Sequence, residues 1–133
     1  MKIKSLVLIL SLTLLTACQT ISPIFVDYNG VRMDVAKWIN QHQLLSMQQK
    51  RSMVQLSKAQ QQLQRIDNIS ETQKLTIAKD NSIAMHCAQQ HLTESQISQL
   101  QQQIFGDDKQ RILDIYDQKF PKLKLDVNAI QCE

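Results

Sequence analysis

Hydrophobic positions along most of the chain recur at the three- and four-residue spacing of helices. Between Val31 and Ile66 a heptad frame gathers apolar residues on one seam, which predicts one helix that is long for a small domain. The seam consists of Val31, Val35, Trp38, His42, Leu45, Gln49, Ser52, Leu56, Ala59, Leu63 and Ile66, of which eight are apolar. Because the middle of the seam is polar, a bent helix and two separate helices remain alternatives. The seam itself fits an intramolecular core or a self-associating coiled coil.

Two later stretches place Ser or Thr three residues before Gln, which is the spacing of a capping box. Ser70 with Gln73 predicts a helix over residues 71–90, and Thr93 with Gln96 predicts the start of the next helix. The expected buried positions of these two helices are Leu75, Ala78, Met85, Ala88, Ile97, Leu100 and Ile104.

The C-terminal part predicts one more helix and a short extended tail. Gly106 should end the preceding helix, the aspartates at 107–108 suit the first turn of the next, and Pro121 should stop it. The expected apolar face of this last helix is Ile112, Leu113, Tyr116 and Phe120. Residues 122–127 alternate apolar and charged side chains with a period of two, so they could pair with residues 24–28 as a minor two-stranded β element.

Composition supports a helical fold class. The 133 residues include only two glycines and two prolines, the residues that most often interrupt helices, and the chain is long enough for one domain. We therefore predict an all-α protein, with a small helical domain over residues 31–133 and one long N-terminal helix.

The N-terminus has the three-part pattern of an export signal. Lys2 and Lys4 precede an apolar run of about ten residues, which is too short for a hydrocarbon core that needs about twenty. The run closes on Leu-Thr-Ala-Cys at residues 15–18, which resembles the lipobox of bacterial lipoproteins. The alternative is an ordinary secreted protein with Cys18 near its cleavage site.

The lipoprotein resemblance implies how the chain is processed and where it resides. Residues 1–17 would be removed as a signal peptide, Cys18 would carry the covalent acyl chains, palmitate among them, and residues 18–30 would form a tether. Gln19 rather than aspartate implies sorting to the outer membrane, with the periplasmic side expected. Loss of residues 1–17 leaves 116 residues and, by removing two lysines, lowers the net charge from +3 to about +1.

Cys87 and Cys132 remain as an even pair in a compartment that oxidises thiols, so we expect a disulfide. The alternative is a metal site, because His86 and His91 lie beside Cys87, and Cys87 with His91 has the i, i+4 spacing of a helical ligand pair. We favour the disulfide and expect neither a metal nor another cofactor beyond the lipid.

No catalytic motif can be placed on the chain, so we expect a binding or envelope-assembly protein rather than an enzyme. The basic helix predicted over residues 31–66 is the expected contact surface, towards an envelope protein or peptidoglycan rather than nucleic acid. Its expected contact residues are Val35, Trp38, Leu45, Lys50, Arg51, Leu56 and Lys58. The oligomeric state stays open.

A second resemblance suggests an alternative function. Leu-Thr-Glu-Ser-Gln at residues 92–96 is similar to the LTxxQ signature of Spy and CpxP-type periplasmic chaperones, which are small helical proteins that hold unfolded clients. Residues 69–73, Ile-Ser-Glu-Thr-Gln, depart from this signature at two positions. Two capping boxes at successive helix starts explain both stretches without a chaperone.

Overall fold

The computed structural model describes residues 30–42 and 44–133, and within them the fold is all-α. The α-helices are α1 (Met33–Gln41), α2 (Met47–Gln61), α3 (Glu71–His91), α4 (Glu94–Phe105) and α5 (Lys109–Lys119). Short 3-10 helices follow α2, α4 and α5 as η2 (Gln62–Asn68), η3 (Gly106–Asp108) and η4 (Val127–Ala129). The predicted fold class is confirmed.

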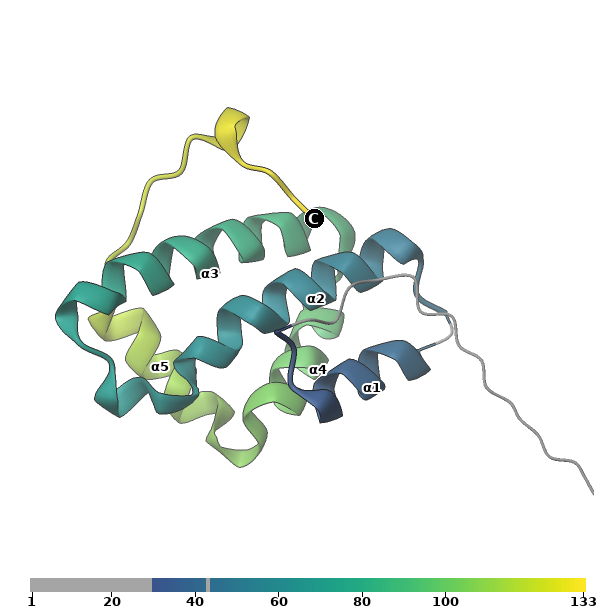
Figure 1. Cartoon of the computed structure of the whole chain (residues 1–133), viewed down its shortest axis with the longest axis horizontal. Coiled ribbons are helices and arrows are strands. Elements are labelled where there is room, and N and C mark those ends of the chain that lie inside the picture. The colour runs from purple at the N-terminus through teal and green to yellow at the C-terminus, as the bar shows by residue number, and fades with distance from the viewer. Residues whose placement is uncertain (1–29, 43) are drawn as a thin grey trace, which may run out of the picture.

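Helix α2 is the central element of the domain. It packs against α3 along one side and against α1 and α4 on the other, while α5 covers η2 and α4 (Figure 1). The seam predicted over residues 31–66 supplies much of the core, because its apolar members in α2 and η2 are buried together with residues of α3 and α4. The seam therefore serves as intramolecular core.

The predicted single long helix is wrong, because α1 and α2 are separate helices. Helix α1 stops at Gln41, where His42 adopts an extended backbone and its Nδ1 lies 2.8 Å from the Trp38 carbonyl oxygen. Ser46 then begins α2 with a capping box: its hydroxyl accepts from the Gln49 N–H at 3.1 Å, and Gln49 Oε1 accepts from the Ser46 N–H at 2.9 Å. This local pair of hydrogen bonds satisfies amides that a continuous helix would bond internally.

The two helix starts predicted from capping boxes are confirmed, whereas the aspartates at 107–108 lie in η3 and α5 begins only at Lys109. Ser70 opens α3 and Thr93 opens α4, each through a complete capping box with the Gln three residues on. Gly106 ends α4 with a φ of 59°, a left-handed value that favours glycine. Of the expected buried positions, Leu75 is wrong: its side chain is 57% exposed.

The predicted β element does not form in the described part of the chain. Residues 122–126 have no regular secondary structure, and Val127 begins η4. Residues 24–28, the proposed pairing partner, lie outside the described residues. Residues 121–132, here called the C-terminal strap, instead run as an arch over α3 (Figure 1). The period-two pattern thus belongs to an irregular segment that runs along α3.

Candidate functional site

Two of the residues expected to contact a partner belong to the core. Val35 in α1 and Leu56 in α2 are both fully buried. They pack among the apolar side chains that join these helices to α3 and α4. Their role in the described conformation is therefore to hold the domain together.

Four of the remaining expected residues gather where α1 ends and α2 begins. The Trp38 ring lies 4.2 Å from the His42 ring between centroids, and Leu45 follows in the connection. Lys50 Nζ donates to the Asn40 carbonyl oxygen at 3.5 Å, which brings the first turn of α2 back to the end of α1. We call this surface the α1–α2 corner; it consists of Trp38, His42, Leu44, Leu45, Lys50 and Arg51.

His42 and Leu44 belong to the corner but were not among the expected contact residues. The Leu44 side chain is 99% exposed, whereas those of Trp38 and Leu45 are half-buried. Leu44 falls off the heptad seam and between the two helices, so the seam offered no reason to select it. The Ser-Met-Gln-Gln stretch at 46–49 could have predicted the exposure of Leu44, because a capping box there places Leu44 in the connection between two helices.

The corner also carries unneutralised positive charge. Arg51 is exposed and forms no ion pair with any residue that the structure describes. Asp34 is the one acidic residue of α1 and α2, and it already pairs with Arg32 at 2.5 Å. Lys58, further along α2, pairs instead with Glu133 at 3.5 Å. The expected contact residues thus divide between the corner, the core and the C-terminus.

Arg32 fastens the start of α1 to the end of α4. Its Nη1 donates to the Ile104 carbonyl oxygen at 3.0 Å and its Nη2 to the Gln103 carbonyl oxygen at 3.1 Å. The same guanidinium holds the pKa of the Asp34 carboxyl below its usual range, chiefly by hydrogen bonding. On α5, burial of the Tyr116 side chain raises the pKa of its phenol.

Cys87 and Cys132 are joined as a disulfide, with their Cα atoms 5.6 Å apart. Cys87 is fully buried near the C-terminal end of α3, so the bond pins the end of the strap to that part of the helix. With both sulfurs bonded to each other, neither is a free ligand for the alternative metal site. Nε2 of His86 lies 3.0 Å from the Gln90 amide, and the described residues contain no cluster of three metal-ligating side chains.

The predicted lipidation site lies outside the described residues. Cys18, the signal peptide at 1–17 and all but the last residue of the 18–30 tether belong to the part that the structure leaves undescribed. Over residues 30–42 and 44–133, none of the helices combines the length and apolar character needed to cross a membrane.

Comparison of the chain with protein-family models, with curated proteins and with solved structures found no match. In the Leu-Thr-Glu-Ser-Gln stretch, Thr93 Oγ1 accepts from the Gln96 N–H at 3.1 Å, and Gln96 Oε1 accepts from the Thr93 N–H at 2.9 Å. Leu92 is buried at the same helix start. Three motif residues thus have structural roles in opening α4.

Proposed function

We propose that the protein is a lipoprotein anchored to the outer membrane through acyl chains on Cys18, and that its helical domain faces the periplasm and binds another envelope component. The lipobox at residues 15–18 supports the anchor. Several acyl chains contribute about 0.8 kcal/mol per buried methylene, which is enough together for stable attachment. The domain then acts as a tethered binding module.

The observation that carries the binding role is the α1–α2 corner. The almost fully exposed Leu44 and the half-buried Leu45 lie in the connection that follows the half-buried Trp38. Lys50 and Arg51 come next in α2, and the one acidic residue of the two helices, Asp34, is already paired with Arg32. Aromatic and Arg side chains around an apolar centre are typical of protein interfaces. The charge favours an acidic segment of an envelope protein, whose association would be accelerated by attraction and weakened by salt.

A photo-reactive residue at Leu44, introduced in the full chain in cells, tests this proposal. We expect one defined crosslinked protein, and weaker capture when Arg51→Glu reverses the charge at the corner. The same photo-reactive residue at Gln118, exposed on α5, is the matched control and should not capture that protein. Identical products from the two positions, or capture of bulk envelope alone, would contradict the proposed contact surface. Crosslinked products that lose their added mass when peptidoglycan is digested would instead identify the cell wall as the partner.

The anchor has its own test, which does not depend on the partner. Cys18→Ala should abolish incorporation of labelled palmitate and release the protein from the membrane fraction. If the variant stays in the outer membrane and wild-type protein incorporates no label, the lipoprotein proposal is wrong.

A Spy-like chaperone is the alternative function, and it predicts that stoichiometric protein suppresses aggregation of an unfolded client.

A further inference from the structure

The C-terminal strap is longer than the distance that it spans. It leaves α5 at Phe120, whose ring lies 5.7 Å from Lys74 Nζ at the start of α3, and it ends on Cys87 through Cys132. The helix covers about 20 Å between Lys74 and Cys87 at 1.5 Å per residue. Twelve extended residues reach about 40 Å, so the excess length bows outward as the arch in Figure 1.

The strap is held most firmly at its two ends, and between them the half-buried Leu123 packs against the core. Phe120 is buried at one end, and the disulfide and Glu133 hold the other, where the Glu133 N–H donates to Gln55 Oε1 at 3.2 Å. Between them, the backbone of residues 121–125 makes no hydrogen bond to the rest of the described chain. A segment held in this way stands off from α3 and leaves space beneath it.

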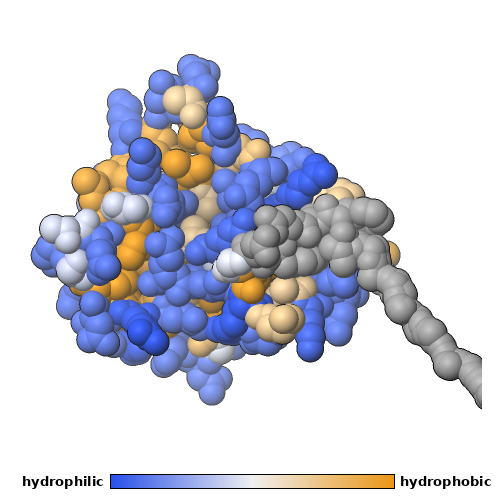
Figure 2. Space-filling model, viewed as in Figure 1, coloured by the Kyte–Doolittle hydropathy of each residue, from blue (hydrophilic) through white to orange (hydrophobic). Residues whose placement is uncertain are grey.

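That space is a hollow of about 450 Å³, here called the strap hollow. Its volume lies within the range of about 300–1,000 Å³ that is usual for small-molecule sites. Most of its lining is apolar and comes from both α3 and the strap. Figure 2 shows hydrophobic side chains gathered under the arch. The apolar lining includes Leu75, Ile83, Leu123, Leu125 and Ile130. This is where the unexpectedly exposed Leu75 points.

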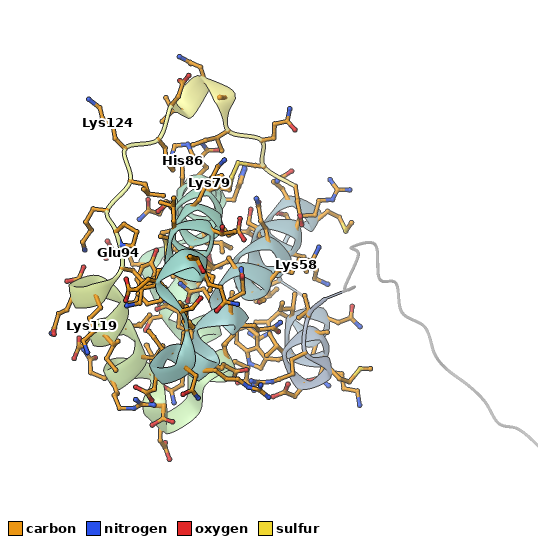
Figure 3. The ribbon with its side chains drawn as sticks, turned by 60° about the vertical axis from the view of Figure 1, so that its left-hand side comes forward. Lys58, Lys79, His86, Glu94, Lys119 and Lys124 are labelled. Carbon is orange, nitrogen blue, oxygen red and sulfur yellow. A yellow bond between two sulfur atoms is a disulfide. The ribbon has the colours of Figure 1, made fainter. Side chains whose placement is uncertain are left out.

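Charge on the lining is predominantly positive. Lys79 on α3 and Lys124 on the strap form no ion pair or hydrogen bond with any described residue, and Figure 3 shows the first on α3 under the arch and the second directed outward. Asp126 also lines the hollow, but its carboxylate accepts from the Asn128 N–H at 3.1 Å and caps η4. Lys79 is therefore an unpaired cation beside an apolar cavity.

We propose that the strap hollow binds a single-chain amphiphile with an anionic head. The alkyl chain would lie between α3 and the strap against Leu75, Ile83 and Leu125, where it displaces water from apolar surface. The head would remain at the rim beside the Lys79 ammonium, where an attractive charge pair can form without full desolvation. A free fatty acid and an anionic lysophospholipid share this chemistry.

Titration of the oxidised full-length chain with dodecanoate, dodecanol and lysophosphatidylglycerol, monitored by displacement of a fluorescent fatty acid, tests the proposal below the critical micelle concentrations. We expect saturable binding of dodecanoate that is tighter than that of the alcohol. Lysophosphatidylglycerol binding without dodecanoate binding would identify a lipid rather than a free acid as the ligand source. Absence of saturable binding by both anionic probes would overturn the proposal.

Variants separate the head from the chain. Lys79→Gln should weaken dodecanoate about threefold to fivefold, as expected for a solvent-exposed charge pair, and leave the alcohol unchanged. Leu75→Glu, at a position where the side chain is 57% exposed, should abolish binding of both because it places a charge in the apolar lining. Lys119→Gln on α5, outside the lining, is the matched control. Anionic probes that bind all four proteins equally would overturn the assignment to this hollow.

Discussion

Asn81 of α3 donates from Nδ2 to the carbonyl oxygen of Ala59 in α2 at 3.0 Å. The same nitrogen donates to the Ile77 carbonyl oxygen at 2.9 Å, and the side chain is buried. One amide thus ties the longest helix to the last turn of the central one. The side-chain amide nitrogen of Asn81 therefore donates two hydrogen bonds inside the protein, as a buried polar group requires. Replacement of Asn81 tests the contribution of this contact.

Asn81→Asp should lower the free energy of unfolding by about 3 kcal/mol or more, because it places an unpaired carboxylate opposite two carbonyl oxygens. Asn81→Leu should cost less, since the Ala59 carbonyl also accepts from the Gln62 N–H. Urea unfolding at pH 7 measures both values. Asn68→Asp makes the same change at an exposed position and should have little effect. Equal unfolding midpoints for Asn81→Asp and Asn68→Asp would contradict the inferred role.

Thr93→Ala should lower the free energy of unfolding by about 1 kcal/mol, because α4 loses its N-cap acceptor. Thr93→Asp keeps a cap acceptor and adds negative charge at the helix N-terminus, so its stability should match that of the wild type. The aspartate variant nevertheless breaks the LTxxQ signature. Thermal unfolding measures the cap, and client aggregation assays measure the motif. Any aggregation suppression that Thr93→Asp loses without losing stability would favour the chaperone alternative over a purely structural motif.

Helix starts could be predicted because their determinants are local. Ser70 and Thr93 need only a Gln three residues on, and both capping boxes formed as expected. Ser46 with Gln49 has the same spacing, yet the heptad seam suggested continuity across it. The seam misled because a helix, a turn and a second helix can bury one apolar face as well as a single helix can.

The α1–α2 corner and the strap hollow could not be predicted from the sequence, because each depends on residues brought together by the fold. Val35 and Leu56 looked like contact residues, but the seam on which they lie is the side that α3 and α4 cover. Leu75 fits a buried helical position, but the strap stands off from it. Periodicity identifies an apolar face and does not say what lies opposite.

The Arg32–Asp34 pair predicts a small acid-dependent component of stability. The pKa of Asp34 is lower in the folded chain, so the pair contributes fully above the ordinary Asp pKa of about 4 and less as the pH falls towards the lowered value. Both side chains are substantially exposed, which limits the contribution to about 1 kcal/mol or less. Asp34→Asn should therefore be destabilising at pH 7 and approach the wild type in strong acid.

A double-mutant cycle checks the source of this pH dependence. Urea unfolding of wild type, Asp34→Asn, Arg32→Gln and the double variant at a series of pH values gives the coupling energy of the pair. We expect a coupling that declines below about pH 4. A coupling that stays constant down to strong acid would assign the effect of Asp34 to its position in the first turn of α1 rather than to Arg32.

The disulfide predicts that reduction loosens the strap and weakens the domain. Cys87 and Cys132 are 45 residues apart, and closing a loop of that size contributes about 4 kcal/mol on the chain-entropy estimate. Reductant should lower the free energy of unfolding of the wild type by about 2–4 kcal/mol and leave Cys132→Ser unaffected. Urea unfolding with and without reductant measures this difference. Identical curves for oxidised and reduced wild type would contradict a stabilising disulfide.

Reduction should also expose the strap to trypsin, because Lys122 and Lys124 lie in the segment that makes no backbone hydrogen bonds to the rest of the described chain. We expect cleavage at these two lysines to accelerate under native conditions, ahead of cleavage at Lys58, whose helix is packed on both sides. Cys132→Ser should be cleaved equally fast with and without reductant. Since the free strap no longer forms one wall of the strap hollow, dodecanoate binding should fall in the same samples. Faster cleavage without loss of binding would mean that α3 alone holds the ligand.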